Sequence, residues 1–161
     1  MSNEISEEDK KFMRLAVECS KKNIEEGGGP FGAVIVKDGK LIAEGGNRVV
    51  PTLDPTAHAE ICCIRKACQE LKDFSLKGCV LYTSCEPCPM CLSAIYWARI
   101  DKIFYANTRN DAKNINFDDS LIYDEVKKEL HERKIPIIKV DDSEAIKVFH
   151  LWHNKNDKIH Y

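Results

Sequence analysis

The sequence predicts an α/β protein: a three-layer α/β/α sandwich around a mixed five-stranded sheet. Three observations predict this class. Apolar residues at helical spacing alternate along the chain with short β-branched runs, which are typical of strands. A strand, a helix and a strand follow one another between residues 79 and 106, which implies a right-handed crossover and parallel pairing. The length of 161 residues suits a single domain, 1–161, with one core.

Local signals set the bounds of the expected elements. Glycine and proline runs end the helices, and an Asp-Gly pair joins the first two strands as a two-residue hairpin. Ser6 is expected to cap the first helix, and Asp54 the second, with Pro55 at its first position. The expected elements are a helix over 6–26, strands over 31–37 and 40–47, a helix over 54–71, a strand over 79–83, a helix over 87–99, a strand over 100–106, a polar loop over 107–119, a helix over 120–131, a fifth strand over 135–140 and a helix over 143–154.

The composition excludes several classes of protein. No apolar run approaches the roughly 18 residues that suggest a transmembrane helix, and the charged residues 1–11 do not form a secretory signal. The formal net charge of −2 gives no hint of the basic face that a nucleic-acid enzyme usually shows. Eight cysteines without a signal peptide indicate a reducing compartment. We therefore expect a cytoplasmic protein with no membrane association, and we do not expect a nucleic-acid partner.

Two short motifs in the middle of the chain carry the chemistry. His58 and Glu60 form H-x-E, and Cys88 and Cys91 belong to a later P-C-x-x-C. This ordered combination is the signature of zinc-dependent deaminases. His58, Cys88 and Cys91 would supply one nitrogen and two thiolates to a tetrahedral Zn2+ whose fourth position stays open for water. Zinc lowers the pKa of that water to about 7, and Glu60 would carry its proton to the ring nitrogen and the departing amine.

Both half-motifs are expected at helix N-termini, where free amides and the positive end of the dipole favour thiolates. Residues two apart do not share a helix face, so His58 and Glu60 reach one ion only if the helix start lies against the metal. A structural interpretation makes the same residues a core histidine, a solvated glutamate and two buried thiols. Cys85 could compete as a ligand, although packing at a strand end is the simpler interpretation. The remaining cysteines are expected to be small core residues: Cys19, Cys62, Cys63, Cys68 and Cys79.

The motif predicts the reaction and leaves the substrate open. Hydroxide attack on an amidine carbon, N=C–NH2, expels ammonia, and cytosine, adenine and guanine all contain that unit. Selection must therefore come from the walls of the pocket. Asn47 ends the second expected strand. It is either a turn residue whose amide satisfies its own backbone or a side-chain amide aimed at a purine edge.

The sequence resembles the cytidine deaminase-like superfamily along nearly its whole length, and most closely the small bacterial guanine deaminases. The segments that carry the resemblance are 29–39, 54–60, 81–91, 94–99, 117–120 and the terminal Tyr161. The resemblance implies hydrolysis of guanine to xanthine and ammonia, with Zn2+ as cofactor. Similar enzymes are homodimers that exchange a C-terminal segment. By that resemblance, a tail over about 142–161 would cover the active site of a partner subunit.

The resemblance also implies roles for the matching residues. His58, Cys88 and Cys91 would hold zinc, and Glu60 and Asp119 would be catalytic. The residues that would contact or enclose the substrate are Phe31, Asn47, Ala59 through its backbone amide, Trp97, Asp119 and Tyr161. Core packing is an alternative for Phe31 and Trp97, and a frayed terminus is an alternative for Tyr161.

Asp119 also has a chemical argument of its own. One carboxylate can accept from the exocyclic amine and the neighbouring ring N–H of guanine at once. Adenine lacks that ring donor and would leave the carboxylate poorly paired. The alternative is that Asp118 and Asp119 are solvated loop acids. Three other functions stay open: a tRNA adenosine deaminase, a deaminase of a nucleoside such as guanosine or cytidine, and a zinc-stabilised interaction module that would have no use for Glu60.

Overall fold

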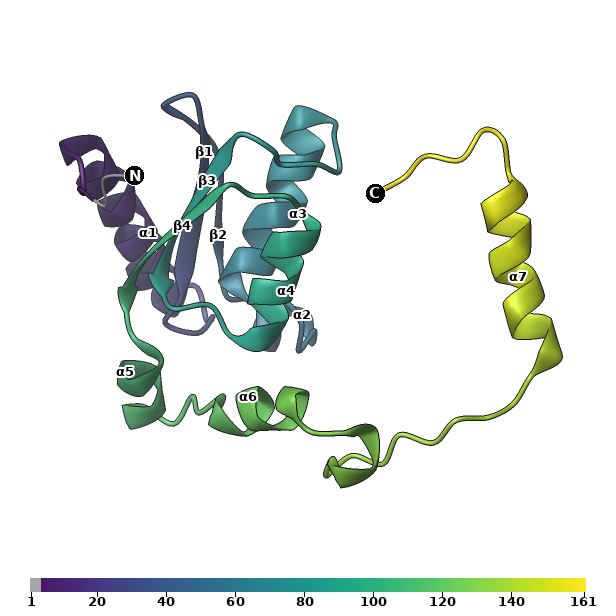
Figure 1. Ribbon diagram of the computed structural model, residues 1–161. Helices are drawn as coiled ribbons and strands as arrows, with labels where there is room; N and C mark the ends of the chain where they lie inside the picture. Colours follow the sequence, from purple (N-terminus) through teal and green to yellow (C-terminus); the bar gives the residue numbers. More distant parts are fainter. Residues whose placement is uncertain (1–3) are drawn as a thin grey trace. The chain divides into compact units, whose positions relative to one another are not determined.

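The computed structural model describes residues 4–161, which divide into two compact units, residues 4–119 and Ser120–Tyr161. Each unit is described by itself. The first unit contains the sheet, with strand order β2-β1-β3-β4 (Figure 1). Its elements are α1 Glu7–Glu25, β1 Gly32–Lys37, β2 Lys40–Gly46, α2 Val49–Thr52, α3 Ala59–Leu71, β3 Cys79–Cys85, α4 Pro89–Trp97, β4 Lys102–Asn107 and α5 Arg109–Asn114.

The sheet is mixed, as predicted. Strand β1 pairs antiparallel with β2 and with β3, whereas β3 pairs parallel with β4. The hairpin between β1 and β2 turns at Asp38 and Gly39, which have φ of 50° and 72°. Positive φ at both central residues is what a tight turn between right-twisted strands requires.

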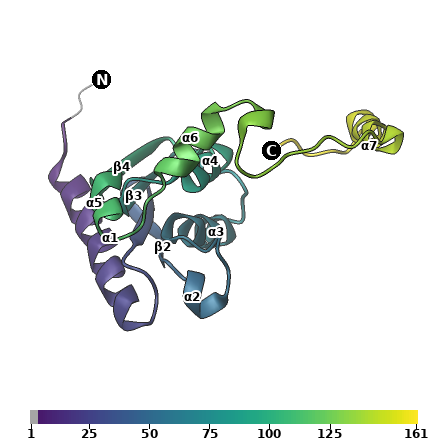
Figure 2. The same ribbon diagram turned by 90° about the horizontal axis from the view of Figure 1, so that it is seen from below.

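Helices cover both faces of the sheet, and alternate residues of β1 supply the two cores. Ala33 and Ile35 belong to one core with residues of α3 and α4, whereas Val34 and Val36 belong to a second core with Phe12 of α1. Figure 1 and Figure 2 show α1 on one side of the strands and α3 with α4 on the other. The predicted three-layer α/β/α arrangement is therefore confirmed.

The second long helix begins later than predicted. It starts at Ala59 with His58 as its N-cap, so the prediction that Asp54 caps this helix was wrong. The Asp54 carboxylate instead accepts from the amide and the hydroxyl of Thr56, at 2.9 and 2.6 Å. This is an Asx turn, in which an Asp side chain bonds backbone two residues further on. The later start places His58 itself at the helix N-terminus.

The predicted polar loop over 107–119 was also partly wrong, because it contains α5. Thr108 caps this short helix, accepting from the Asp111 amide, while the Asp111 carboxylate accepts from the Thr108 amide. Such a reciprocal capping box satisfies two backbone or hydroxyl donors at the helix start, which favours a helical turn in a polar segment.

The second unit contains α6 Ser120–Lys127, a 3-10 turn Leu130–Glu132 and α7 Ser143–Asn154, which Asp142 caps. The predicted fifth strand over 135–140 was wrong: this segment has no regular structure, and Ile135 and Ile138 are 79% and 81% exposed. β-branched residues favour extended backbone, but a strand also needs a neighbour for its hydrogen bonds. Within residues 4–161, no helix is both long enough and apolar enough to span a membrane.

Candidate active site

Two helix starts bring the predicted metal ligands together. His58 is the N-cap of α3 and Cys88 is the N-cap of α4, and both have extended backbones, with ψ of 159° and 169°. Because an N-cap residue lies outside the helical repeat, the His58 side chain need not follow the helical spacing that separates it from Glu60. His58 and Glu60 were expected to reach one ion only if the helix start lies against the metal. The N-cap position of His58 meets this requirement.

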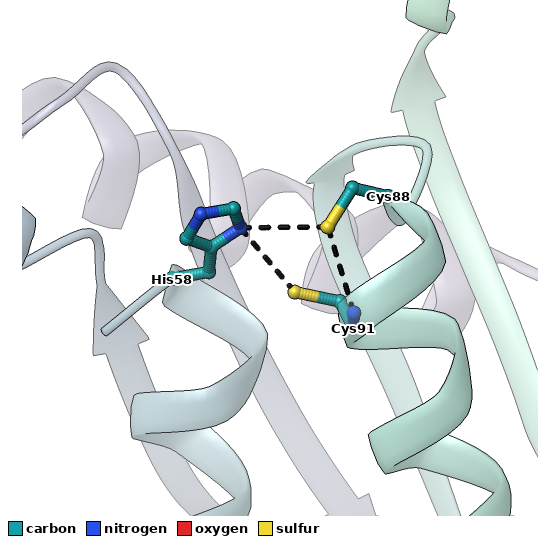
Figure 3. A group of neighbouring side chains, drawn as sticks. All are labelled: His58, Cys88 and Cys91. Atoms are coloured by element: carbon teal, nitrogen blue, oxygen red, sulfur yellow. Dashed lines mark hydrogen bonds between the residues drawn. The ribbon is translucent and has the colours of Figure 1, made fainter. Parts of the chain in front are cut away.

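The three side chains point toward one another (Figure 3). The Nδ1 atom of His58 lies 3.5 Å from the Sγ atom of Cys88 and 3.5 Å from the Sγ atom of Cys91. All three donor atoms lie within 4.8 Å of one another. A tetrahedral zinc with ordinary Zn–N and Zn–S bonds requires a nitrogen–sulfur separation of about 3.6 Å. The donor set of one imidazole and two thiols also has the softness that zinc prefers, so the site fits this ion.

One sulfur of this cluster is already a thiolate at neutral pH. The pKa of Cys88 is lowered to about 4, chiefly by its hydrogen bond with the Cys91 thiol and also by its hydrogen bond with His58. The pKa of Cys91 is raised, first by the same contact with Cys88 and then by burial and the nearby Glu60. The pKa of His58 is raised by its hydrogen bond with Cys88. A cation that binds both sulfurs therefore displaces the proton that Cys91 retains.

Cys85 does not belong to this cluster. It is the last residue of β3, and its thiol lies 3.8 Å from the carbonyl oxygen of Thr108. Burial raises the pKa of Cys85 to about 11, so the thiol stays neutral. Among residues 4–161, the metal-ligating group that contains Cys88 has His58 and Cys91 as its other members.

Glu60 lies beside the ligands and is buried, with 6% exposure. Its Oε1 atom accepts a hydrogen bond of 2.7 Å from the hydroxyl of Thr83, and its negative charge contributes to the raised pKa of Cys91. The second residue of α3 thus places a carboxylate next to a sulfur of the metal site. A proton shuttle must lie within hydrogen-bond reach of the groups it serves, and this role of Glu60 stays a prediction.

Asp119 and Phe31 also belong to the first unit. Burial raises the pKa of Asp119, and the negative charge of Cys88 raises it further, which places this carboxyl within electrostatic reach of the metal ligands. The ring of Phe31 packs edge-on against Phe117, with 5.0 Å between the ring centroids. Phe31 also packs against the core on the α3 and α4 face, so its interpretation as a core residue holds at least for one side of the ring.

Asn47 and Ala59 are both buried. The Oδ1 atom of Asn47 accepts from the Val49 amide at 3.2 Å, which is the turn interpretation that the sequence left open. Its backbone carbonyl accepts from Asn23 at 2.8 Å. Ala59 is the first residue of α3, where a backbone amide has no partner within the helix itself.

Trp97 and Tyr161 lie in different units. Trp97 is the last residue of α4 and is 64% exposed, with the Arg99 guanidinium 5.8 Å from its ring centroid. Tyr161 is 74% exposed in the second unit. The predicted roles of both residues in enclosing a substrate stay predictions.

The sequence did not single out Thr83, which contacts Glu60. Thr83 and Ser84 are consecutive polar residues at the end of an otherwise apolar strand, and both are buried. Two buried hydroxyls there need hydrogen-bond partners. This pair of polar residues in an apolar strand is the sequence signal that could have identified Thr83.

The fold and the ligand geometry define a class of protein: α/β hydrolytic deaminases that use a single zinc ion. Residues 6–107 match the family model of the cytidine and deoxycytidylate deaminase zinc-binding region. The chain belongs to this family, and its cofactor is zinc.

The individual proteins that the chain resembles include guanine deaminases and a tRNA-specific adenosine deaminase. The chain is 52% identical to the guanine deaminase of Bacillus subtilis over 93% of this chain and 97% of that protein. The crystal structure of a B. subtilis guanine deaminase superposes with a TM-score of 0.92 and 49% identity, covering 100% of this chain and 99% of the other. The tRNA-specific adenosine deaminase of Aquifex aeolicus is 42% identical over 59% of this chain and 63% of its own length.

Proposed function

We propose that this protein is a guanine deaminase, which converts guanine and water into xanthine and ammonia. The observation that carries the proposal is the 52% identity to B. subtilis guanine deaminase over 93% of this chain. The similarity to the A. aeolicus tRNA deaminase covers 59% of the chain. The guanine deaminase similarity therefore extends over much more of the protein than the part shared with a tRNA enzyme.

In this proposal His58, Cys88 and Cys91 hold the zinc ion. Bound zinc lowers the pKa of a water molecule to about 7 and so supplies hydroxide at neutral pH. His58 and Cys88 are the N-cap residues of α3 and α4, and Cys91 lies in the first turn of α4. Removing either cysteine would remove one of the three ligands, and the group holds no fourth member among residues 4–161 that could replace it.

Glu60 moves the protons. The water oxygen bonds to C2 of guanine, and the bond between C2 and the exocyclic nitrogen breaks. Glu60 takes the first proton from the water and gives it to N3 of the ring. It then carries the second proton of the same oxygen to the amine, which leaves as ammonia. The product has a carbonyl at C2 and a hydrogen on N3, which is xanthine.

Asp119, Asn47 and Ala59 select the purine. The Asp119 carboxylate would accept from both the exocyclic amine and N1–H, a charge-assisted fork that adenine cannot complete. The Asn47 amide and the Ala59 backbone amide would bind the other polar edge, and Phe31 would form an apolar wall. Burial raises the pKa of Asp119, so a pair of donors from the base would stabilise its charged form.

The second unit is proposed to complete the site as part of the same deaminase domain. Its large apolar residues are exposed, including Phe149 and Leu151 of α7 at 73% and 72%. A 12-residue helix alone in water is marginal, so α7 needs a surface to pack against. We propose a homodimer in which the segment from about 142 to 161 covers the partner's site, with Trp97 and Tyr161 enclosing the base. A cytoplasmic location accords with the eight free thiols.

The decisive test is ammonia release by the purified zinc-loaded protein with a panel of substrates. The panel contains guanine, guanosine, adenine, cytosine, cytidine and an adenosine-containing anticodon stem-loop. Turnover of guanine well above the others is expected, whereas preference for the stem-loop would indicate a tRNA adenosine deaminase instead.

Asp119→Ala should lower guanine turnover at least about tenfold while zinc content stays near one per chain, since the lost fork involves a charged acceptor. Near-normal turnover would reduce Asp119 to a loop acid.

A further inference from the structure

A buried hydroxyl orients the proton-carrying carboxylate. We propose that Thr83 is the positioning residue of Glu60: its hydroxyl occupies Oε1, so that Oε2 exchanges protons with the substrate. This inference rests on the proposed function for its chemistry, and on the contact between β3 and α3 for its geometry. Thr83 acts through Glu60 and is not itself assigned a contact with the substrate.

The contact between the two side chains is short and buried. Thr83 is 1% exposed and Glu60 is 6% exposed, and the Thr83 Oγ1 atom lies 2.7 Å from Glu60 Oε1. A carboxylate out of water is costly unless donors satisfy it, and a donor to an ionised acceptor gives one of the stronger hydrogen bonds. This bond therefore has enough strength to select one orientation of the carboxyl group.

The surroundings of Thr83 suit a group that transfers a proton and recovers it. The same Oγ1 atom lies 3.0 Å from the backbone carbonyl oxygen of Cys85. A hydroxyl has one hydrogen and two lone pairs. Before transfer it donates to the Glu60 carboxylate. After Glu60 has taken a proton at Oε2, Oε1 is still an acceptor, so the hydroxyl keeps donating to it. The same hydrogen bond therefore holds the carboxyl group in both states of Glu60 without movement of any heavier atom.

The neighbouring residue shows that this role is specific to one position. Ser84 is also buried, at 3% exposure, but its hydroxyl accepts from the backbone amide of Gly32 at 3.0 Å. Its contact joins β3 to β1 and does not involve Glu60. Ser84 therefore provides a matched control: a buried hydroxyl on the same strand with a purely structural partner.

The test compares Thr83→Val, Thr83→Ser and Ser84→Ala by kcat and KM for guanine, zinc content and melting temperature. Thr83→Val is expected to lower kcat about tenfold to a hundredfold, as loss of a hydrogen bond to a charged group predicts. KM and zinc content should stay within about twofold, because neither the ligands nor the base contacts change. Thr83→Ser should restore most of kcat, and Ser84→Ala should lower the melting temperature without lowering kcat.

The proposal would be overturned if Thr83→Val kept the wild-type kcat, or if its loss were matched by Ser84→Ala or by loss of zinc. If the valine variant does not fold, the ratio of kcat between Thr83→Ser and Thr83→Ala isolates the hydroxyl in the same way. A double-mutant cycle on melting temperature, with Thr83→Val and Glu60→Ala, tests the contact without any substrate. Additive losses there would refute it. Failure of the wild type to turn over guanine would instead refute the proposed function and leave this cycle to decide on Thr83.

Discussion

Asn23→Ala is expected to destabilise the protein by about 2–4 kcal/mol and to weaken the binding of guanine. Asn23 is a buried polar residue on the inner face of α1, at 3% exposure. Its amide nitrogen donates to the carbonyl oxygens of Gly29 and Asn47, at 2.7 and 2.8 Å, and its Oδ1 atom accepts from Arg48 at 2.9 Å. One side chain therefore joins α1 to the segment before β1 and to the segment after β2.

The expected loss of stability follows from the hydrogen bond that each partner of Asn23 loses. The Asn47 carbonyl lies at a buried residue, and an unsatisfied buried acceptor costs about 1–3 kcal/mol. The Gly29 carbonyl still accepts from the Phe31 amide at 2.9 Å, so its loss is at the lower end, about 1 kcal/mol. Arg48 lies closer to solvent, and the loss of its contact contributes little. A Cβ atom on Gly46 would come within 2.3 Å of Asn23 Oδ1, so the side chain is closely packed and its truncation also opens a void.

Urea unfolding followed by circular dichroism measures the stability, and initial rates measure KM. The melting temperature should fall by roughly 5–15 °C for a domain of this size. KM for guanine should rise severalfold, because the backbone of the proposed base-binding Asn47 loses its support. Asn114→Ala, at an exposed asparagine of α5, should change the stability by less than about 0.5 kcal/mol. A loss below about 1 kcal/mol for Asn23→Ala would show that water or a neighbouring donor replaces the amide, and would refute the reasoning.

Three further predictions concern catalysis, assembly and acid stability. Glu60→Gln should keep one zinc per chain by metal analysis and lower ammonia release by at least about a hundredfold, since an amide cannot carry the proton; an active variant would remove the shuttle role. Co-expression of Glu60→Gln with a copy lacking residues 155–161 should regain about a quarter of wild-type activity if the tails are exchanged between partners, whereas tails that cover their own site would regain none. The pKa of Asp9 is lowered chiefly by the hydrogen bond that Tyr82 donates at 2.6 Å, so this stabilisation is present above the unfolded pKa near 4 and is lost as the pH falls through the folded value. Tyr82→Phe should therefore cost about 1 kcal/mol at pH 7 and lose less stability than the wild type between about pH 5 and pH 3 in urea titrations; parallel curves would contradict the linkage.

The metal ligands were predictable from the sequence because their spacing and order are local and chemically restrictive. H-x-E followed by P-C-x-x-C is the signature of zinc deaminases, and the observed nitrogen–sulfur distances of 3.5 Å agree with that interpretation. The Asp38-Gly39 hairpin and the cap at Ser6 were also correct, since each depends on residues within a few positions.

Other features depended on contacts that a local pattern does not contain. The Asp54 side chain could either cap a helix or form an Asx turn with Thr56, and in the folded chain it forms the turn. The extended pattern over 135–140 lacked a neighbouring strand, without which alternation alone does not make a sheet.

The sequence by itself determined the class of chemistry, the alternation of helices and strands and the identity of the candidate metal ligands. Only the tertiary structure decided how the carboxylate of Glu60 is held and which residues support Asn47. Thr83 lies 23 positions from Glu60, and Asn23 lies 24 positions from Asn47. Such pairs meet because helices pack on a sheet with a particular register, and that register results from the burial of the whole core rather than from any short run of residues.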